Sequence, residues 1–403
     1  MRRGPVLEIR PRRTRTCGVS VMTLALSGLL ATPAAGQSSV SDVLSFLLTN
    51  RSVQTADFKQ DENAAAATRD SISKLLLTEL ATVPISSSAG GFSYRLNPAL
   101  GTLERSTDSF GPFFTERSLT AGAQRASVGI AFQAASFDDI EGRNLRDGSL
   151  VAIAGTVHGA AQPFDVETLT LRIDTRTVTL SANYGVTDRL DIGAALPFIT
   201  IGLSGERIDT YRGSRFPQAT ASITASGVGD VLVRAKYNVY RGEGKGLAFG
   251  GESRLPTGDP QNLLGTGRAT IKPLIIGSVE GRRATLHADA GYSLGGLGRE
   301  LDYAAALTAI ANRRVTLIGE LNGRRLESLG RLTYITEPHP GLVDIDTIRL
   351  SSVAEGGHRI VAVAGFKWNV AATWLVSANV IHNVTSAGLN ARWTPTFTLD
   401  YAF

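Results

Sequence analysis

Apolar and polar residues alternate with a period of two along most of the chain after residue 123. The last segment shows the pattern clearly, because aromatic and apolar side chains interleave there with polar ones. The apolar set is Trp393, Phe397, Leu399, Tyr401 and Phe403, and the polar set is Arg392, Thr394, Thr396, Thr398 and Asp400. Successive side chains of a β-strand point to opposite faces, so the pattern predicts a strand with one apolar and one polar face.

Twelve segments carry this alternation, most of them close to the length of a tilted strand that crosses a bilayer. They cover residues 124–137, 167–184, 189–204, 227–240, 246–257, 268–280, 284–296, 300–311, 314–325, 358–369, 373–384 and 391–403. Nearly every segment places a charged residue on its polar face, which the core of a soluble sheet would not accept. We therefore predict an all-β fold, a transmembrane antiparallel up-and-down β-barrel of about twelve strands with a short helical N-terminal segment. Fourteen strands is the alternative, if residues 92–104 and 149–157 also join the barrel.

The connections between these segments alternate in length, as expected of a membrane barrel with short periplasmic turns and long outer loops. Short connections fall at residues 185–188, 241–246, 281–283, 312–313 and 370–372. Long connections fall at residues 138–166, 205–226, 258–267 and 326–357. An even strand number places both termini in the periplasm. The alternation slips at residues 174–177 and at Pro197, where a bulge or bend is expected.

The first residues predict a secretory signal peptide over residues 1–36. Six arginines precede an apolar run at residues 19–30, and the small-residue stretch Ala34-Ala35-Gly36 follows that run. The run is shorter than the roughly 20 apolar residues of a membrane helix. The six arginines less Glu8 give the leader a charge of +5, which equals the formal charge of the whole 403-residue chain. The remainder is near neutral, so no nucleic-acid partner is expected.

The cysteine content adds to this prediction. The only cysteine, Cys17, precedes the apolar run of the leader. The exported protein is therefore expected to contain no thiol, no disulfide and no cysteine metal site.

Residues 37–122 are predicted to form a helical and irregular segment ahead of the barrel at residues 123–403. Apolar residues recur there at spacings of three and four, first at residues 40–48 and again at residues 72–80. A run of four alanines at residues 64–67 also favours helix. Three alternatives remain open for this segment: helices on the periplasmic side, a plug in a mouth of the barrel, or a linker without a function of its own.

Three short motifs follow one another along strand, turn and loop. They are Tyr184-Gly-Val-Thr-Asp-Arg-Leu-Asp-Ile-Gly193, Gly227-Val-Gly-Asp-Val-Leu-Val-Arg-Ala-Lys-Tyr237 and Arg254-Leu-Pro-Thr-Gly-Asp259. Together they resemble outer-membrane proteins of the phenol-degradation-pathway (MetA-type) family, which are described as transporters. The resemblance covers about residues 165–403. It implies passage of small, aromatic or hydrophobic compounds, and it brings no catalytic motif.

The predicted lumen is where the chain concentrates its charges. We expect nine inward side chains of both signs to line it as a pore: Arg234, Lys236, Glu252, Arg254, Lys272, Asp289, Glu320, Arg359 and Lys367. In a barrel of this size, such charges either line a small water-filled path or pair across a narrow interior and fill it. The sequence leaves both alternatives open.

Catalytic and metal chemistry is not expected. The five histidines have no obvious nucleophile beside them in the sequence: His158, His287, His339, His358 and His382. His287 and Asp289 are an inward pair on one segment, which we interpret as a lumenal ion pair because a catalytic triad needs a nucleophile within hydrogen-bond reach. No metal motif of the His-Glu-x-x-His kind occurs, and the glycine-rich stretches lack the lysine of a phosphate loop. We therefore expect no metal and no cofactor.

These observations predict a channel in the cell outer membrane that passes small solutes passively and has no enzymatic activity. Its expected partners are outer-membrane lipid, the small-molecule solute and the barrel-assembly machinery, which would engage Phe403. The alternative is a structural or adhesive outer-membrane barrel with an occluded lumen and no transport. Selectivity of a channel would come from the lumen diameter and its mixed charges.

Overall fold

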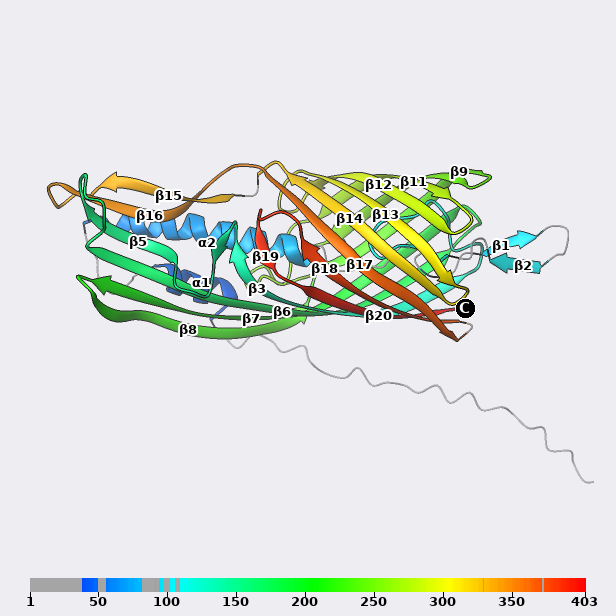
Figure 1. Cartoon of the computed structure of the whole chain (residues 1–403), viewed down its shortest axis with the longest axis horizontal. Helices are drawn as coiled ribbons and strands as arrows, with labels where there is room; N and C mark the ends of the chain where they lie inside the picture. The colour runs from blue at the N-terminus through cyan, green and yellow to red at the C-terminus, as the bar shows by residue number, and fades with distance from the viewer. Residues whose placement is uncertain are drawn as a thin grey trace, which may run out of the picture. The chain divides into compact units, whose positions relative to one another are not determined.

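Twelve strands close into one antiparallel barrel in the computed structural model (Figure 1). They are β3 (Ala126–Ile140), β6 (Asp165–Gly185), β7 (Leu190–Tyr211), β9 (Val231–Gly242), β10 (Lys245–Leu255), β11 (Thr270–Glu280), β12 (Ala284–Gly295), β13 (Glu300–Asn312), β14 (Val315–Leu326), β17 (Gly357–Ala371), β18 (Trp374–Asn383) and β20 (Thr394–Ala402). The last strand pairs with the first, with Phe397 opposite Phe132, and this pairing closes the ring. Each strand falls on one of the twelve predicted segments, so the barrel prediction is confirmed.

The structure describes residues 38–49, 56–81, 91, 94–97, 102–105, 109–328, 330–371 and 373–403. The predicted leader at residues 1–36 lies outside these residues. In the described part of the chain, no helix has both the length and the apolar content needed to cross a bilayer.

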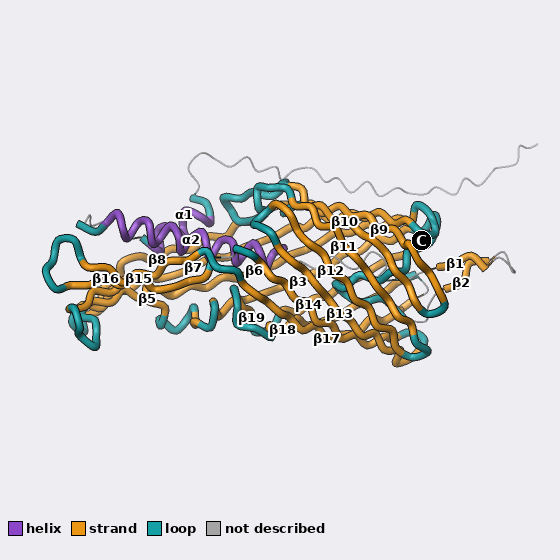
Figure 2. Tube along the Cα trace, turned by 90° about the horizontal axis from the view of Figure 1, so that it is seen from above, coloured by secondary structure: helices purple, strands orange, loops and turns teal. Residues whose placement is uncertain are grey.

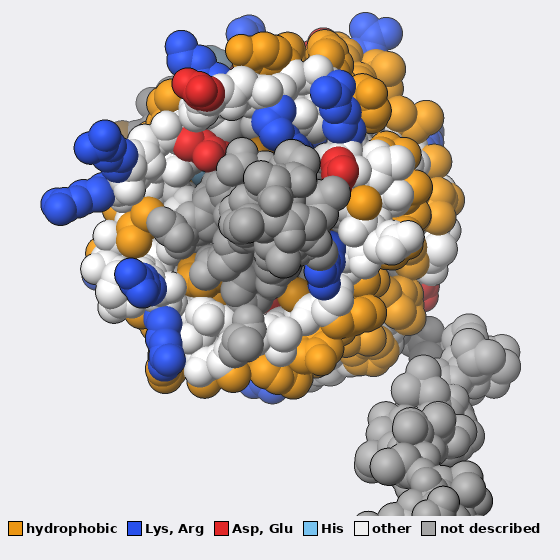
Figure 3. Space-filling view, turned by 90° about the vertical axis from the view of Figure 1, so that its right-hand side faces the viewer, with side chains coloured by type: hydrophobic (Ala, Val, Ile, Leu, Met, Phe, Trp, Pro, Cys, Tyr) orange, Lys and Arg blue, Asp and Glu red, His pale blue; other side chains and the backbone are white. Residues whose placement is uncertain are grey.

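The alternation along each strand separates an apolar outer surface from a polar interior. On β12, Leu286 is 53% exposed on the outside, whereas the neighbouring His287 is 2% exposed on the inside. Figure 3 looks onto the end of the barrel that carries the C-terminus, where hydrophobic side chains cover the flank and Lys and Arg side chains surround the rim. Such a closed sheet satisfies every backbone group in the wall without water, as hydrocarbon requires.

A charge placed on the apolar outer surface is expected to destabilise the barrel. Leu307 lies near the middle of β13 and is 53% exposed. The substitution Leu307→Arg should lower the free energy of unfolding in lipid vesicles by about 2–4 kcal/mol, as measured by urea titration. The control is Leu342→Arg, because Leu342 is equally exposed but lies in a turn outside the barrel wall. Equal losses in both variants would contradict a hydrocarbon-facing role for Leu307.

Six further strands belong to the same sheet. They are β4 (Arg143–Asn144), β5 (Leu150–Val157), β8 (Ser214–Val228), β15 (Arg331–Pro338), β16 (Ile345–Val353) and β19 (Leu389–Ala391). Four of them join the far halves of β6 and β7 in a sheet of order β8-β7-β6-β5-β16-β15, which extends beyond the barrel (Figure 1). We call it the outer sheet.

The outer sheet corrects the predicted outer loops and the fourteen-strand alternative. The long connections at 138–166, 205–226 and 326–357 were expected to be loops, but they hold most of these additional strands. The fourteen-strand alternative is also wrong, because β5 pairs within the outer sheet. Among the described residues, β1 (Tyr94–Asn97) and β2 (Thr102–Arg105) pair with each other. A strand that continues past the membrane keeps its alternation, so the pattern alone does not show where the wall ends.

Neither of the two expected irregularities occurs in the pairing of β6 with β7. These strands stay in register through residues 174–177 and at Pro197. Strand β7 pairs with β9 as far as Ala195 and with β8 from Phe198, so Pro197 stands where the partner changes. Its carbonyl oxygen accepts from the N–H of Gly229 on that same side. Proline lacks a backbone N–H, but at the junction between β9 and β8 this removes no hydrogen bond from a continuous ladder.

Two helices cover the inner face of the outer sheet, α1 (Val40–Leu48) and α2 (Phe58–Ala81) (Figure 2). A capping box starts α1, since the N–H of Asp42 donates to the Ser39 hydroxyl and the Asp42 carboxylate accepts from the Ser39 N–H. Leu44 and Leu47 of α1 and Ile72 of α2 are buried against the sheet. This apolar cluster is the largest in the described part of the protein.

The helices lie at the end of the barrel opposite the short turns. The N–H of Ser41 donates to the carbonyl oxygen of Gln261, in the outer connection between β10 and β11. At the other end, the N–H of Ala126 donates to the carbonyl oxygen of Phe403. The first described residues are thus at the outer end, whereas both termini were expected in the periplasm. The helices occupy the outer mouth rather than the periplasmic side.

Candidate functional site: the barrel interior

Residues 109–122 pass through the periplasmic half of the barrel, and we call them the lumen segment. They contact opposite walls: the N–H of Phe110 donates to the Thr316 hydroxyl of β14, and the Asn238 side-chain amide of β9 donates to the carbonyl oxygen of Ser118. Phe110 and Arg117 are each at most 1% exposed. The lumen segment therefore fills the space that a water path would need in this half of the barrel.

Glu320 on β14 holds the first part of the lumen segment. Its carboxylate accepts the backbone N–H groups of Phe113, Phe114 and Thr115, and also the Thr115 hydroxyl at 3.1 Å. Lys367 on β17 donates to the carbonyl oxygen of Pro112 at 2.8 Å. Hydrogen bonds of this kind to charged groups are about twice as strong as neutral ones. The two side chains thus fix the backbone of the segment from adjacent strands.

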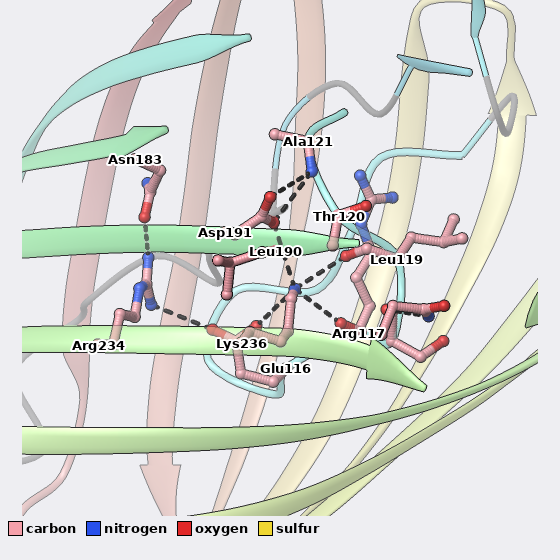
Figure 4. Close-up of polar contacts among 12 residues, drawn as sticks. Glu116, Arg117, Leu119, Thr120, Ala121, Asn183, Leu190, Asp191, Arg234 and Lys236 are labelled. Atoms are coloured by element: carbon pink, nitrogen blue, oxygen red, sulfur yellow. Dashed lines mark hydrogen bonds and ion pairs between the residues drawn. The ribbon is translucent and has the colours of Figure 1, made fainter. Parts of the chain in front are cut away.

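Glu116 connects the middle of the lumen segment to two cations of β9 (Figure 4). Its two carboxylate oxygens lie 3.1 Å from Arg234 Nη1 and 3.3 Å from Lys236 Nζ. Lys236 also donates to two backbone carbonyl oxygens of the segment, and its Nζ lies 4.0 Å from Asp191 on β7. All four side chains are buried. Removing one member of such a set leaves a buried charge uncompensated, at a cost of about 3–5 kcal/mol.

The end of the lumen segment packs against the periplasmic turn between β6 and β7. The Asp191 carboxylate accepts the N–H of Ala121 at 3.0 Å, and the Thr120 hydroxyl donates to the carbonyl oxygen of Asp188. A Cβ atom on Gly185 would lie 1.9 Å from the carbonyl oxygen of Gly122. The close approach of the two backbones therefore needs glycine at position 185.

The outer half of the interior contains a cavity of about 210 Å³. Its wall includes apolar side chains on one side, among them Phe114, Val363 and Ile381. Charged side chains from β10 to β14 and from β17 complete the wall, together with Glu79 of α2. Phe114 of the lumen segment thus separates part of this cavity from the filled half below.

The charged side chains of the cavity form a belt along neighbouring strands. Glu252 stands between Arg234 and Lys272 in the strand register, and Lys272 Nζ lies 2.9 Å from the Glu252 carboxylate. Farther along, Arg324 pairs with Glu300 and Asp302 on β13. The belt alternates in sign along these strands, so most of its charges are compensated by a neighbour.

One position in the belt depends on the helix. Arg324 and Arg359 are directly opposite each other on β14 and β17. Arg359 is compensated by Glu79, with 2.6 Å between Arg359 Nη2 and the Glu79 carboxylate. The last turn of α2 therefore supplies the acid that compensates Arg359, whereas Arg324 is compensated by Glu300 and Asp302.

The structure directs all nine predicted pore residues into the interior. Five are buried: Arg234, Lys236, Glu320, Arg359 and Lys367. Four of these contact the lumen segment, and Arg359 binds α2. The other four line the outer cavity: Glu252, Arg254, Lys272 and Asp289. Their role in lining an open path stays a prediction.

The sequence analysis missed the acids that complete these contacts. Glu116 and Glu79 lie outside the barrel strands, so the alternation gave no signal for them. Glu300 and Asp191 lie on strands, and the phase of the alternation could have identified Asp191 as inward. Glu116, Glu79 and Asp191 each pair with a cation or a backbone amide far away in the sequence, whereas Glu300 pairs with Arg324 on the neighbouring strand.

In the described part of the chain, His287 has no carboxylate partner. The expected ion pair between His287 and Asp289 is absent: His287 Nδ1 lies 3.0 Å from the Ser278 hydroxyl, and the Asp289 carboxylate accepts the N–H of Glu116. Ser278 is a potential nucleophile that the sequence did not reveal, but its hydroxyl accepts the N–H of Ser118 and both side chains are buried outside the cavity lining. Among the described residues, no group of three His, Cys, Asp or Glu side chains is placed to hold a metal ion.

Comparison with known proteins supports the sequence resemblance. The family described as "Putative MetA-pathway of phenol degradation" matches residues 149–316. Among curated proteins, none matches the chain. This family match confirms the resemblance over residues 165–316 of the expected 165–403. The protein is a β-barrel of the cell outer membrane.

Solved structures of outer-membrane proteins are also similar to the chain. An outer membrane channel from Pseudomonas putida F1 has 13% identity and a TM-score of 0.45, over 71% of this chain and 98% of that one. The translocator domain of the autotransporter NalP from Neisseria meningitidis has 11% identity and a TM-score of 0.37, over 70% and 89%. The NanC porin has 8% identity and a TM-score of 0.34, over 63% and 99%.

Proposed function

We propose that this MetA-type outer-membrane barrel is a channel for small solutes and that the arrangement described above is its closed state. Opening would require the lumen segment to leave the periplasmic half of the barrel. The solute would enter through the outer cavity and leave past Glu116. No covalent chemistry and no cofactor take part in this proposal.

The observation that carries the proposal is the way in which the lumen segment is attached. The ring of twelve strands closes through its own backbone pairing, from β3 round to β20, and none of these pairings uses the lumen segment. The segment is held largely by charged and polar side chains such as Glu320, Arg234 and Lys236. Water and ions can replace such contacts, so the segment can leave a wall that remains intact.

The lining of the cavity supports a small solute with both polar and apolar parts. About 210 Å³ is available, next to the charged belt on one side and to Phe114, Val363 and Ile381 on the other. Ligand sites commonly combine an apolar wall with a few placed polar groups. A cavity with this lining could hold the small aromatic or hydrophobic compounds that the family resemblance implies.

A planar-bilayer recording of the purified, folded protein tests the proposal. We expect brief, stepwise openings of uniform size, separated by long closed periods because the lumen segment is well anchored. The folded state is checked by gel electrophoresis with and without heating, because a folded closed barrel migrates differently from the heat-unfolded chain. Silence of correctly folded protein, both in the natural form and in variants with a loosened lumen segment, would overturn the channel.

The same contacts support one alternative, a structural barrel with a permanently filled lumen. The number of buried polar contacts to the lumen segment favours it, because each would have to break during opening. The two functions differ in one measurable respect. A permanently filled barrel would stay silent even after its anchors are removed.

A further inference from the structure

The outer surface of β3, β6, β7 and β8 changes abruptly from apolar to polar. One row of register partners across these strands is wholly apolar and faces outward: Phe132, Val178, Phe198 and Val228. The next outward row, two residues farther from the periplasm, is Ala134, Arg176, Thr200 and Ser226. Where a strand leaves the hydrocarbon of the membrane, its outward side chains change from apolar to polar. The boundary between the two rows therefore marks the outer edge of the hydrocarbon on this side of the barrel.

Above that boundary, the surface combines arginines with hydroxyl groups. The following outward rows are Ser136, Asp174, Gly202 and Thr224, and then Arg172, Ser204 and Ser222. The Thr200 and Ser226 hydroxyls are 2.9 Å apart, so they form a paired polar row. Arg146, from the connection after β4, reaches the same surface and donates to the Ser136 hydroxyl at 2.7 Å. We call this surface the outer polar face.

Two arginines of the outer polar face point outward from one strand. Arg172 and Arg176 are both exposed and lie on the same side of β6, with Asp174 between them. Among the described residues, neither has an ion pair of the kind that fixes the lumen arginines. Asp174 is itself engaged by the Ser136 hydroxyl. The two guanidinium groups are therefore available to an anion outside the protein.

The position of this face decides what can reach it. It continues the lipid-facing surface of the same strands without a break in register, so it faces sideways, toward the head groups of neighbouring lipids. We propose that the outer polar face binds the phosphorylated sugar head group of a glycolipid in the surrounding outer leaflet. Arg172 and Arg176 would pair with phosphate, because the planar guanidinium matches its oxygens in a bidentate way. The hydroxyls of Thr200, Ser204 and Ser222 would bind sugar hydroxyls.

This inference goes beyond the proposed channel, since it concerns the outer surface and leaves the lumen untouched. A protein partner fits less well, because a sideways-facing surface directly above hydrocarbon is occupied by lipid head groups first. An ordinary anionic phospholipid would satisfy the arginines but would leave the hydroxyl rows without partners. The proposal thus requires both parts of the head group, the phosphate and the sugar.

Binding of the purified full-length protein to three lipids in detergent tests the proposal. The lipids are bisphosphorylated lipid A, the same glycolipid after dephosphorylation, and phosphatidylglycerol. We expect tightest binding to the first, and a loss of about tenfold or more for the double variant R172S/R176S, since each cation near an anionic head group contributes about 1 kcal/mol. The matched control R189S/R282S removes two exposed arginines from periplasmic turns and should bind as the natural protein does.

Each other outcome would overturn the proposal. Equal binding of the dephosphorylated glycolipid would exclude phosphate recognition, and equal binding of phosphatidylglycerol would exclude the sugar. Unchanged affinity in R172S/R176S would exclude the two arginines. If that variant does not fold, R172K/R176K serves instead, because it keeps the charge and loses the planar fork, and it should show an intermediate loss. Lipid binding is measured without any conductance recording, so failure of the lipid proposal and failure of the channel proposal can be told apart.

Discussion

Replacing Glu116 and Glu320 together with glutamine is expected to turn a mostly closed barrel into a mostly open one. Glutamine keeps the shape of each side chain but removes the charge that holds Arg234, Lys236 and three backbone amides. Each lost partner of a buried charge costs about 3–5 kcal/mol, and 1.4 kcal/mol changes an equilibrium tenfold. We therefore expect the open fraction in planar-bilayer recordings to rise at least about tenfold, while the twelve-strand wall stays closed by its own backbone pairing.

Glu243→Gln is the matched control for this experiment. Glu243 is an exposed acid in the periplasmic turn between β9 and β10, so its replacement removes the same charge from the same side of the protein. Its recordings should equal those of the natural protein. A folded double variant that conducts no more than this control would show that the lumen segment does not act as the gate.

Replacing Arg349 with alanine is expected to release α2 from the outer sheet. Arg349 is 2% exposed and lies 2.6 Å from both Asp57 and Asp61, just before and within α2. Without it, two nearby carboxylates would share a poorly hydrated site, at a cost of about 3–5 kcal/mol to helix docking. The measurement is the maleimide labelling rate of a cysteine placed at Ile72, which is 1% exposed. We expect this rate to rise at least about tenfold in the R349A background.

The pH dependence of this variant gives a further check. Burial raises the pKa of Asp61, and the hydrogen bond from Arg349 opposes that rise. Removal of Arg349 therefore raises the pKa further. A carboxyl with a higher pKa in the docked helix than in the free helix binds its proton more tightly when docked, so docking becomes more favourable as the pH falls. Labelling of the variant, taken relative to that of a free thiol at the same pH, should thus slow as the pH is lowered.

Arg331→Ala provides the control for helix release. Arg331 on β15 pairs with Glu355, and both side chains are more than half exposed. Exposed pairs of this kind contribute little to stability. The labelling rate at position 72 should stay low in this variant at every pH. Fast labelling there, or slow labelling in R349A at neutral pH, would contradict the assigned role of Arg349.

The barrel could be predicted from the sequence because two solvents act on every strand. Hydrocarbon selects one face and the polar interior selects the other, so each of the twelve strands shows the period. The outer sheet was missed for a related reason. Strand β8 alternates Ala and Ile with Ser and Thr, which is weaker than the contrast in the wall. Asp174 and Arg176 seemed to break the period, but they mark the change of solvent at the hydrocarbon boundary.

The interior could be predicted only on its barrel side. The phase of the alternation placed Arg234, Glu320 and Lys367 inward, as the structure does. It gave no information on Glu116 or Glu79, because their neighbours in sequence are irregular or helical and their partners lie far along the chain. A local sequence pattern does not indicate which distant cation an acid will contact. The sequence therefore predicted a plug only as one of three alternatives for residues 37–122.

Strands β6 and β7 have a mechanical consequence. They run without interruption for 21 and 22 residues, about 70 Å each, from the tip of the outer sheet to the periplasmic turn. At their inner ends, Asn183 bonds to Arg234 and Asp191 bonds to Ala121 of the lumen segment. A force applied at the tip of the outer sheet would therefore be transmitted along these two strands to the side chains that hold the lumen segment.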